Sequence, residues 1–131
     1  ELIWKDKNIL PEFTLKTIKL PLNAHLQKPE HCDWQAALDD IRQRIQETDF
    51  DIALIGAGAW SLPLCVHIKS LGQSAIHTGG ATQILFGIRG GRWAQHPVIS
   101  KYYNPSWCHV LPEELPDTER ETTVPNADKY W

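Results

Sequence analysis

The stretch DIALIGAGAWSLPL, residues 51–64, decides the fold expected for this chain. Its apolar run has no alternation and leads into Gly-Ala-Gly. This is typical of a parallel strand that is covered on both faces and ends in a tight turn. Pro63 suits the first turn of a following helix, and Gly72 is a suitable stop for that helix. The stretch therefore predicts a buried strand over residues 51–56, then a glycine turn, then a helix.

The alternation of strands and helices continues on both sides of this stretch. Upstream, Asp33 is a typical helix N-cap, and apolar residues then recur at helical spacing, which predicts a helix over residues 34–47. Downstream, SAIHT (74–78) is expected to be a short strand, and ATQILFGIRG (81–90) a further helix after a pair of glycines. The apolar positions of the first helix are Trp34, Ala37, Leu38, Ile41 and Ile45.

Elements in this order favour an α/β fold with right-handed crossovers. The expected architecture is a Rossmann-like three-layer fold with a small parallel sheet, preceded by a strand near residues 13–20. We expect a single domain over residues 1–111, with one short helix near 97–103. An extended, irregular tail over residues 112–131, which carries six acidic residues, would follow.

Composition excludes several classes of protein. With a net charge of −3 and a pI of about 6.1, the chain offers no basic field to nucleic acid. Its apolar runs are too short and too broken to span a membrane. Three scattered cysteines and no recognisable signal peptide predict a reduced, cytoplasmic protein. Because the chain has no methionine, we expect that a leader was removed or that this is a piece of a longer chain.

Gly56, Gly58 and Ser61 form the first candidate ligand site. A strand that ends in Gly-x-Gly and opens a helix presents backbone N–H groups and a helix dipole to a phosphate. The dinucleotide fingerprint also requires a third glycine and, about 20 residues later, an acid. This chain has Ser61 and His77 at those places, so no dinucleotide site is expected. Another anionic ligand and a purely structural turn both stay open.

The second glycine turn lies in HTGGATQ, residues 77–83. Ligands bind at the carboxyl ends of the strands in open parallel sheets, so His77, Gly79, Gly80 and Gln83 would line one cleft with the first turn. His77 is the candidate catalytic residue, as an acid/base or as a donor to a phosphate or a sugar hydroxyl. The alternative is a histidine that only bonds nearby backbone at a strand end.

A third glycine-rich segment, GIRGGRW (87–93), follows. Arg89 and Arg92 fit phosphate pairing, with Arg92 as the expected partner, and Trp93 could stack on a base or a sugar. The alternative is a solvated surface with one core tryptophan. Where histidine and cysteine occur in this chain as neighbours, they lack the spacing of zinc ligands, so no metal site is expected.

Three features of the sequence carry a resemblance: a Gly-Ala-Gly-Ala-aromatic turn, a run of the form LG..AIH.GG..Q.LFGI.G.RW, and an ending in Tyr-Trp. With these the chain resembles the C-terminal portion of an uncharacterised bacterial family that is itself similar to glycosyltransferases of the GT-D fold. The resemblance covers most of the chain. The matching residues are Leu71, Gly72, Ala75, Ile76, His77, Gly79, Gly80, Gln83, Leu85, Phe86, Gly87, Ile88, Gly90, Arg92, Trp93, Tyr130 and Trp131.

The resemblance implies a Rossmann-like fold, a nucleotide-sugar ligand and a role in surface polysaccharide synthesis. In the GT-D enzymes an Asp-x-Glu motif near the N-terminus serves the metal and the nucleotide-sugar, and nothing in this chain matches that motif. The chain would therefore supply part of a cleft with no cofactor of its own. Manganese or magnesium would belong to a full-length parent.

Two functions of different classes are carried forward. The first is a glycosyltransferase-like domain that contributes part of a cleft for a nucleotide-sugar or another phosphorylated small molecule; whether this chain is itself an enzyme stays open. The second is a non-catalytic module that binds a metabolite or a protein. Its interface would be exposed aromatic surface between Trp93 and Trp107, with a homodimer as one expected use.

Overall fold

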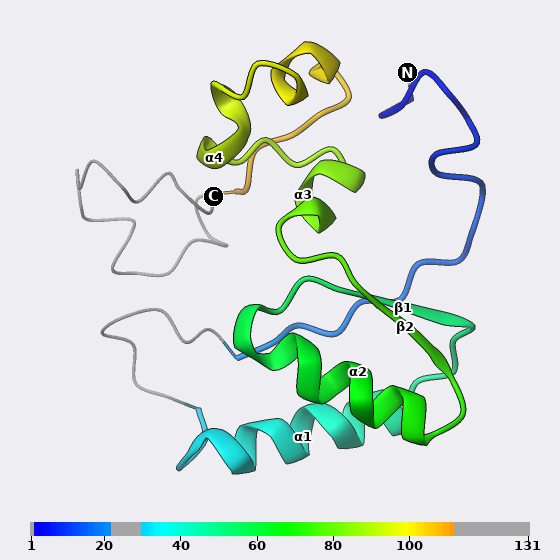
Figure 1. Ribbon diagram of the computed structural model, residues 1–131, viewed down its shortest axis with the longest axis vertical. Helices are drawn as coiled ribbons and strands as arrows, with labels where there is room; N and C mark the ends of the chain where they lie inside the picture. Colours follow the sequence, from blue (N-terminus) through cyan, green and yellow to red (C-terminus); the bar gives the residue numbers. More distant parts are fainter. Residues whose placement is uncertain (1, 22–29, 112–131) are drawn as a thin grey trace. The chain divides into compact units, whose positions relative to one another are not determined.

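The computed structural model describes residues 2–21 and 30–111, so the expected acidic tail lies outside the described residues (Figure 1). The chain divides into two compact units, which are described separately. We call residues 14–21 and 30–82 the glycine-turn unit, and residues 2–13 and 83–111 the aromatic unit. Helices and parallel strands are both present, which confirms the α/β class. The single domain over residues 1–111 stays a prediction.

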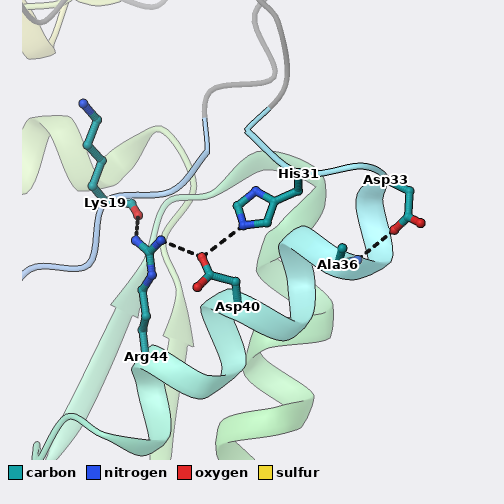
Figure 2. Close-up of polar contacts among 6 residues, drawn as sticks. All are labelled: Lys19, His31, Asp33, Ala36, Asp40 and Arg44. Atoms are coloured by element: carbon teal, nitrogen blue, oxygen red, sulfur yellow. Dashed lines mark hydrogen bonds and ion pairs between the residues drawn. The ribbon is translucent and has the colours of Figure 1, made fainter.

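Helix α1, Trp34–Gln46, forms where the sequence predicts it. The Asp33 carboxylate accepts a hydrogen bond of 2.8 Å from the Ala36 backbone N–H, which satisfies one of the free donors in the first turn (Figure 2). The apolar stripe of α1 is buried at Ala37, Leu38, Ile41 and Ile45. Trp34 continues the spacing of this stripe at the start of the helix but is not buried with the others, since the residue is 45% exposed.

The expected strand–turn–helix–strand unit is confirmed. Strand β1, Ile52–Ile55, leads through the short 3₁₀ helix η1, Gly58–Trp60, into helix α2, Ser61–Ser70. Strand β2, Ser74–His77, then pairs with β1 in parallel. The two strands end in register, since Ile55 lies opposite His77.

The core of the glycine-turn unit lies on one face of this two-stranded sheet. Helices α1 and α2 lie side by side (Figure 1), and their buried residues form one cluster with Ile55 and the residues after it. Ala53 and Ala75 pack partly against that cluster from the same face of the sheet. The core residues are Ala37, Leu38, Ile41, Ile45, Ile55, Ala57, Trp60, Leu64 and Ile68.

The other face of the sheet is exposed, so the expectation of a strand covered on both faces is wrong. Ile52 is 51% exposed, Leu54 37% and Ile76 48%. Because side chains alternate across a strand, these three share the face opposite Ala53 and Ala75. Both helices of the unit pack on the inner face, and the three outer residues are left partly exposed. The continuous apolar run showed that both faces are apolar, and not that both are covered.

The strand expected near residues 13–20 is also wrong. The segment Thr14–Pro21 has no strand assigned, although Ile18 and Leu20 pack partly against the core. Its backbone is bonded to a helix side chain instead of to a neighbouring strand: the Arg44 guanidinium donates to the Lys19 carbonyl over 3.4 Å (Figure 2). The alternating apolar residues therefore reflect a chain lying along α1.

The aromatic unit is organised around tryptophan rings. The buried Trp107 meets Trp4 edge-on, with ring centroids 5.4 Å apart. The Trp107 indole N–H donates to the Ile3 carbonyl over 3.1 Å, and the Trp4 indole N–H donates to the Leu85 carbonyl over 2.8 Å. These contacts join the first residues of the chain to the segment around residue 107.

Shorter helices complete the described residues. The helix expected over 81–90 ends early: α3 spans Ala81–Leu85, because the following backbone turns away to form a bridge between Ile88 and Cys108. Helix α4, Gly91–Ala94, follows. The short helix expected near 97–103 is confirmed as the 3₁₀ helix η2, Ile99–Tyr102. In the part of the chain that is described, none of the helices has the length and apolarity needed to cross a bilayer.

Candidate functional site

The two glycine turns of the glycine-turn unit lie next to each other at the carboxyl ends of β1 and β2. The last carbonyl of β1, on Ile55, accepts hydrogen bonds from the backbone N–H groups of Thr78 (2.9 Å) and Gly79 (3.2 Å). The second turn is therefore bonded to the end of the first strand. The arrangement follows from the register, which ends both strands at the same level.

Gly56 is the point where the two turns touch. A Cβ atom on Gly56 would lie 2.7 Å from the Gly79 carbonyl oxygen and 2.9 Å from the Thr82 Cβ, and closer still to the Thr82 hydroxyl. Real Cβ atoms are almost never found at these separations. Glycine is required here by the contact between the turns, which is a structural reason that does not involve a ligand.

Threonine hydroxyls brace the second turn from within. The Thr82 hydroxyl donates to the Gly79 carbonyl over 2.8 Å and lies 2.6 Å from the Thr78 hydroxyl. Thr78 in turn reaches the Ile55 carbonyl with its hydroxyl, over 3.3 Å. Neither threonine was singled out from the sequence, and both hold the two turns in their observed positions.

Ser61, which stands where the dinucleotide fingerprint has glycine, has a local partner. Its side chain is fully buried, and its hydroxyl accepts a hydrogen bond of 3.0 Å from the Ala57 backbone N–H. One backbone donor of the first turn is thus satisfied by the protein itself. The hydroxyl faces the interior in this structure, and through this hydrogen bond it stabilises the turn.

The open side of the two turns is formed by other residues. Gly58 is exposed and left-handed (φ +53°), and the space beside its α-carbon is empty. His77 is exposed at the end of β2, and a Cβ atom on Gly79 would lie 3.6 Å from the imidazole Nε2, so the ring lies beside the second turn. Gly80 follows, half-buried. Together with Gly56, which is also exposed, these four residues are the accessible part of the two turns.

Gln83, Arg92 and Trp93 belong to the aromatic unit. The Gln83 amide lies against the backbone of Gly90, where a Cβ atom would be 3.2 Å from Oε1. The Arg92 guanidinium lies over the Trp93 ring, 5.8 Å from its centroid, and Trp93 meets His96 edge-on. Their place in a ligand cleft stays a prediction.

Arg89 is held inside the aromatic unit. Its guanidinium donates to the Asn104 carbonyl over 2.7 Å and lies 5.2 Å from the centroid of the Tyr103 ring. Burial raises the pKa of Tyr103, and the nearby charge of Arg89 opposes this shift. The residues between Trp93 and Trp107 are therefore not one exposed aromatic surface, since Trp107 is buried and Tyr103 is half-buried.

A separate, open surface groove of about 630 Å³ is lined by residues of α1, its C-cap and α2, and by none of the glycine-turn residues. A hydrogen bond from Gln35 lowers the pKa of Asp39 at its edge, and the hydrogen bond and charge of Arg42 add to this against an opposing effect of desolvation. None of the sequence-predicted site residues contributes to it. Its lining residues are Asp39, Arg42, Gln43, Gln46, Glu47 and His67.

The residues around the glycine turns do not fit the metal that the GT-D resemblance implies. The chain has no Asp or Glu between Asp51 and Glu113, so neither turn carries a carboxylate of its own. In residues 2–21 and 30–111 no three His, Cys, Asp or Glu side chains gather into a metal-binding group.

His31, which precedes α1, has a carboxylate partner of its own. Its Nε2 lies 3.3 Å from the Asp40 carboxylate, which Arg44 also binds (Figure 2).

A pair of tryptophans beside the first turn was missed by the sequence reasoning. Trp34, the first residue of α1, stacks on Trp60, the last residue of η1. Their ring centroids are 4.8 Å apart and the planes differ by 9°. The available signal was the place of Trp34 directly after the N-cap, where a large side chain can extend past the helix end.

In comparisons with protein-family models, with curated proteins and with solved structures, nothing matched this chain.

Proposed function

We propose that this chain carries part of the ligand cleft of a GT-D-like glycosyltransferase, built on a Rossmann-like three-layer fold. The ligand would be a nucleotide-sugar or another phosphorylated small molecule, and the setting surface polysaccharide synthesis. The observation that supports this most is the pair of parallel strands that end in register, each followed by a glycine turn, with the turns in contact at Gly56. The carboxyl edge of a parallel sheet is where such folds bind phosphates.

The accessible residues divide into two roles. Gly58, Gly79 and Gly80 let a phosphate approach the backbone closely. His77, exposed beside the second turn, donates a hydrogen bond to a phosphate or a sugar hydroxyl, or transfers a proton. Arg92 would pair with the phosphate, while Trp93 and Gln83 would contact the remainder of the ligand.

The first experiment is a titration of the chain with UDP- and GDP-sugars, followed by calorimetry and by tryptophan fluorescence, with and without manganese. We expect binding in the wild type and at least about tenfold weaker binding in the His77→Ala variant, because a hydrogen bond to a charged group contributes about 1.5–3 kcal/mol. His109→Ala, in the aromatic unit, is the matched control for loss of an exposed histidine. No heat and no fluorescence change up to millimolar ligand would refute the proposal.

The exposed sheet face supports a second candidate, a protein-binding module. Ile52, Leu54 and Ile76 form an apolar surface on a parallel sheet, and parallel sheets are normally covered on both faces. In a three-layer fold this is also the face on which a second layer of helices would pack. Light scattering across a concentration series tests the homodimer: a Leu54→Asp variant that stays as dimeric as the wild type would refute the use of this face.

A further inference from the structure

We propose that the exposed face of Trp34 binds the base of a nucleotide whose phosphate lies at the glycine turns. The inference rests on the proposed function, since it assigns the base-binding residue of the same site. It begins from the observation that Trp34, the first apolar position of the α1 stripe, is 45% exposed.

The geometry of the tryptophan pair leaves one ring face available. Trp60 is 5% exposed and its indole is stacked under Trp34, at 4.8 Å between centroids and 9° between planes. One face of the Trp34 indole is therefore covered by Trp60. The surface of Trp34 that water reaches lies on the opposite face and the edges of the ring. A flat aromatic ring added to the exposed face would continue the offset stack and bury apolar area that water now covers.

The pair lies at the end of the sheet where the glycine turns are. Helices α1 and α2 run side by side and both begin at the end where β1 and β2 finish (Figure 1). Trp34 is the first residue of α1. Trp60 follows Gly58 by two residues and directly precedes α2. A phosphate at the first turn would thus have an aromatic platform within the same unit.

The chemistry of the platform suits a nucleobase. The stack presents a π-face, and every nucleobase has a π-face, so such contacts add affinity with little discrimination between bases. The turns have no carboxylate of their own to recognise a ribose hydroxyl. A nucleotide at this site would therefore be held through its base on Trp34 and not through a carboxylate on its ribose.

The experiment measures the contribution of the base at a constant number of phosphates. UMP, GMP and ribose 5-phosphate are titrated by calorimetry into the full chain and into Trp34→Phe, Trp34→Leu and Trp34→Ala variants. We expect UMP and GMP to bind the wild type with similar affinity, about tenfold tighter than ribose 5-phosphate. Trp34→Phe keeps most of this ratio. Trp34→Leu, which still covers Trp60 with apolar volume but has no ring, brings the ratio close to one and leaves ribose 5-phosphate affinity unchanged.

The outcomes separate this inference from the proposed function. If ribose 5-phosphate binds the wild type as tightly as UMP, or if Trp34→Leu retains the ratio, Trp34 does not bind the base and the phosphate site stands. Equal losses for all three ligands in Trp34→Leu would overturn the inference too, by assigning Trp34 a structural role. Binding of none of the three ligands to the wild type would overturn the proposed function and this inference with it. Unfolding midpoints show whether Trp34→Ala is still folded, and Trp34→Leu decides the question if it is not.

Discussion

Substitution of Gly56 by alanine tests the contact between the two glycine turns. The added Cβ would lie 2.7 Å from the Gly79 carbonyl oxygen and 2.9 Å from the Thr82 Cβ. The first of these atoms is backbone, so it cannot move aside by changing a rotamer. The turns would have to separate, which stretches the hydrogen bond of 3.2 Å from Gly79 to the end of β1. Overpacking of this kind costs about 1–3 kcal/mol, and a weakened hydrogen bond adds about 0.5–1.5 kcal/mol.

We therefore expect Gly56→Ala to lower the free energy of unfolding by about 2–3 kcal/mol. Urea unfolding followed by tryptophan fluorescence measures it, because Trp60 lies close to the first turn. Thr82→Ala alone should cost about 1 kcal/mol, from the hydrogen bond that its hydroxyl donates to Gly79. In the double variant Gly56→Ala/Thr82→Ala the closest clash, between the new Cβ and the Thr82 hydroxyl, is removed. The loss of unfolding free energy should therefore be smaller than the sum of the two single losses by about 1 kcal/mol.

Gly58→Ala is the matched control in the same turn. Nothing lies within 4 Å of a Cβ atom at Gly58, so its substitution costs only the left-handed backbone conformation, about 1–2 kcal/mol. Its effect should add to that of Thr82→Ala within about 0.5 kcal/mol. If Gly56→Ala is as stable as the wild type, or if it is simply additive with Thr82→Ala, the contact does not explain the glycine and the reasoning fails.

Three further substitutions follow from single contacts. Ser61→Ala should lower the free energy of unfolding by about 1–3 kcal/mol, because it leaves the Ala57 N–H buried without a partner. The control Ser70→Ala, at an exposed serine, should change it by less than about 0.5 kcal/mol. Equal urea midpoints for the two variants would contradict the stabilising role of the Ser61 hydroxyl. Asp33→Ala should cost about 1 kcal/mol through the lost helix cap and Asp33→Asn much less, as checked by thermal unfolding in circular dichroism. Burial raises the pKa of Tyr103 above its ordinary 10.0, so the folded chain keeps the phenolic proton after the unfolded chain has lost it. The free energy of unfolding should then fall as the pH rises through 10.0, and Tyr103→Phe should remove that part of the decline; a variant with an unchanged alkaline profile would refute the shift.

The local elements were predictable because short-range chemistry determines them. The Asp33 cap, the helix that follows it, and the strand–turn–helix unit of residues 51–64 all depend on neighbours within one or two turns of the chain. The presence of two glycine turns at one edge also followed, since parallel strands place their carboxyl ends together. The prediction of a strand near residues 13–20 failed because alternation shows which side chains are apolar, but does not show which groups bond the backbone N–H and C=O of the segment.

The sequence by itself determined that an apolar strand, β1, is joined through a helix to a second short strand, β2, and that a glycine turn follows each of them. Only the tertiary structure decided that one sheet face is exposed, that Gly56 contacts the opposite turn, that Ser61 is turned inward, and that Trp34 lies outside the core. The physical reason is common to all four. A residue's type sets what its side chain can bury or bond, but which atoms meet it is set only when the helices pack on the sheet. For Gly56 and Trp34 those atoms come from more than 20 residues away.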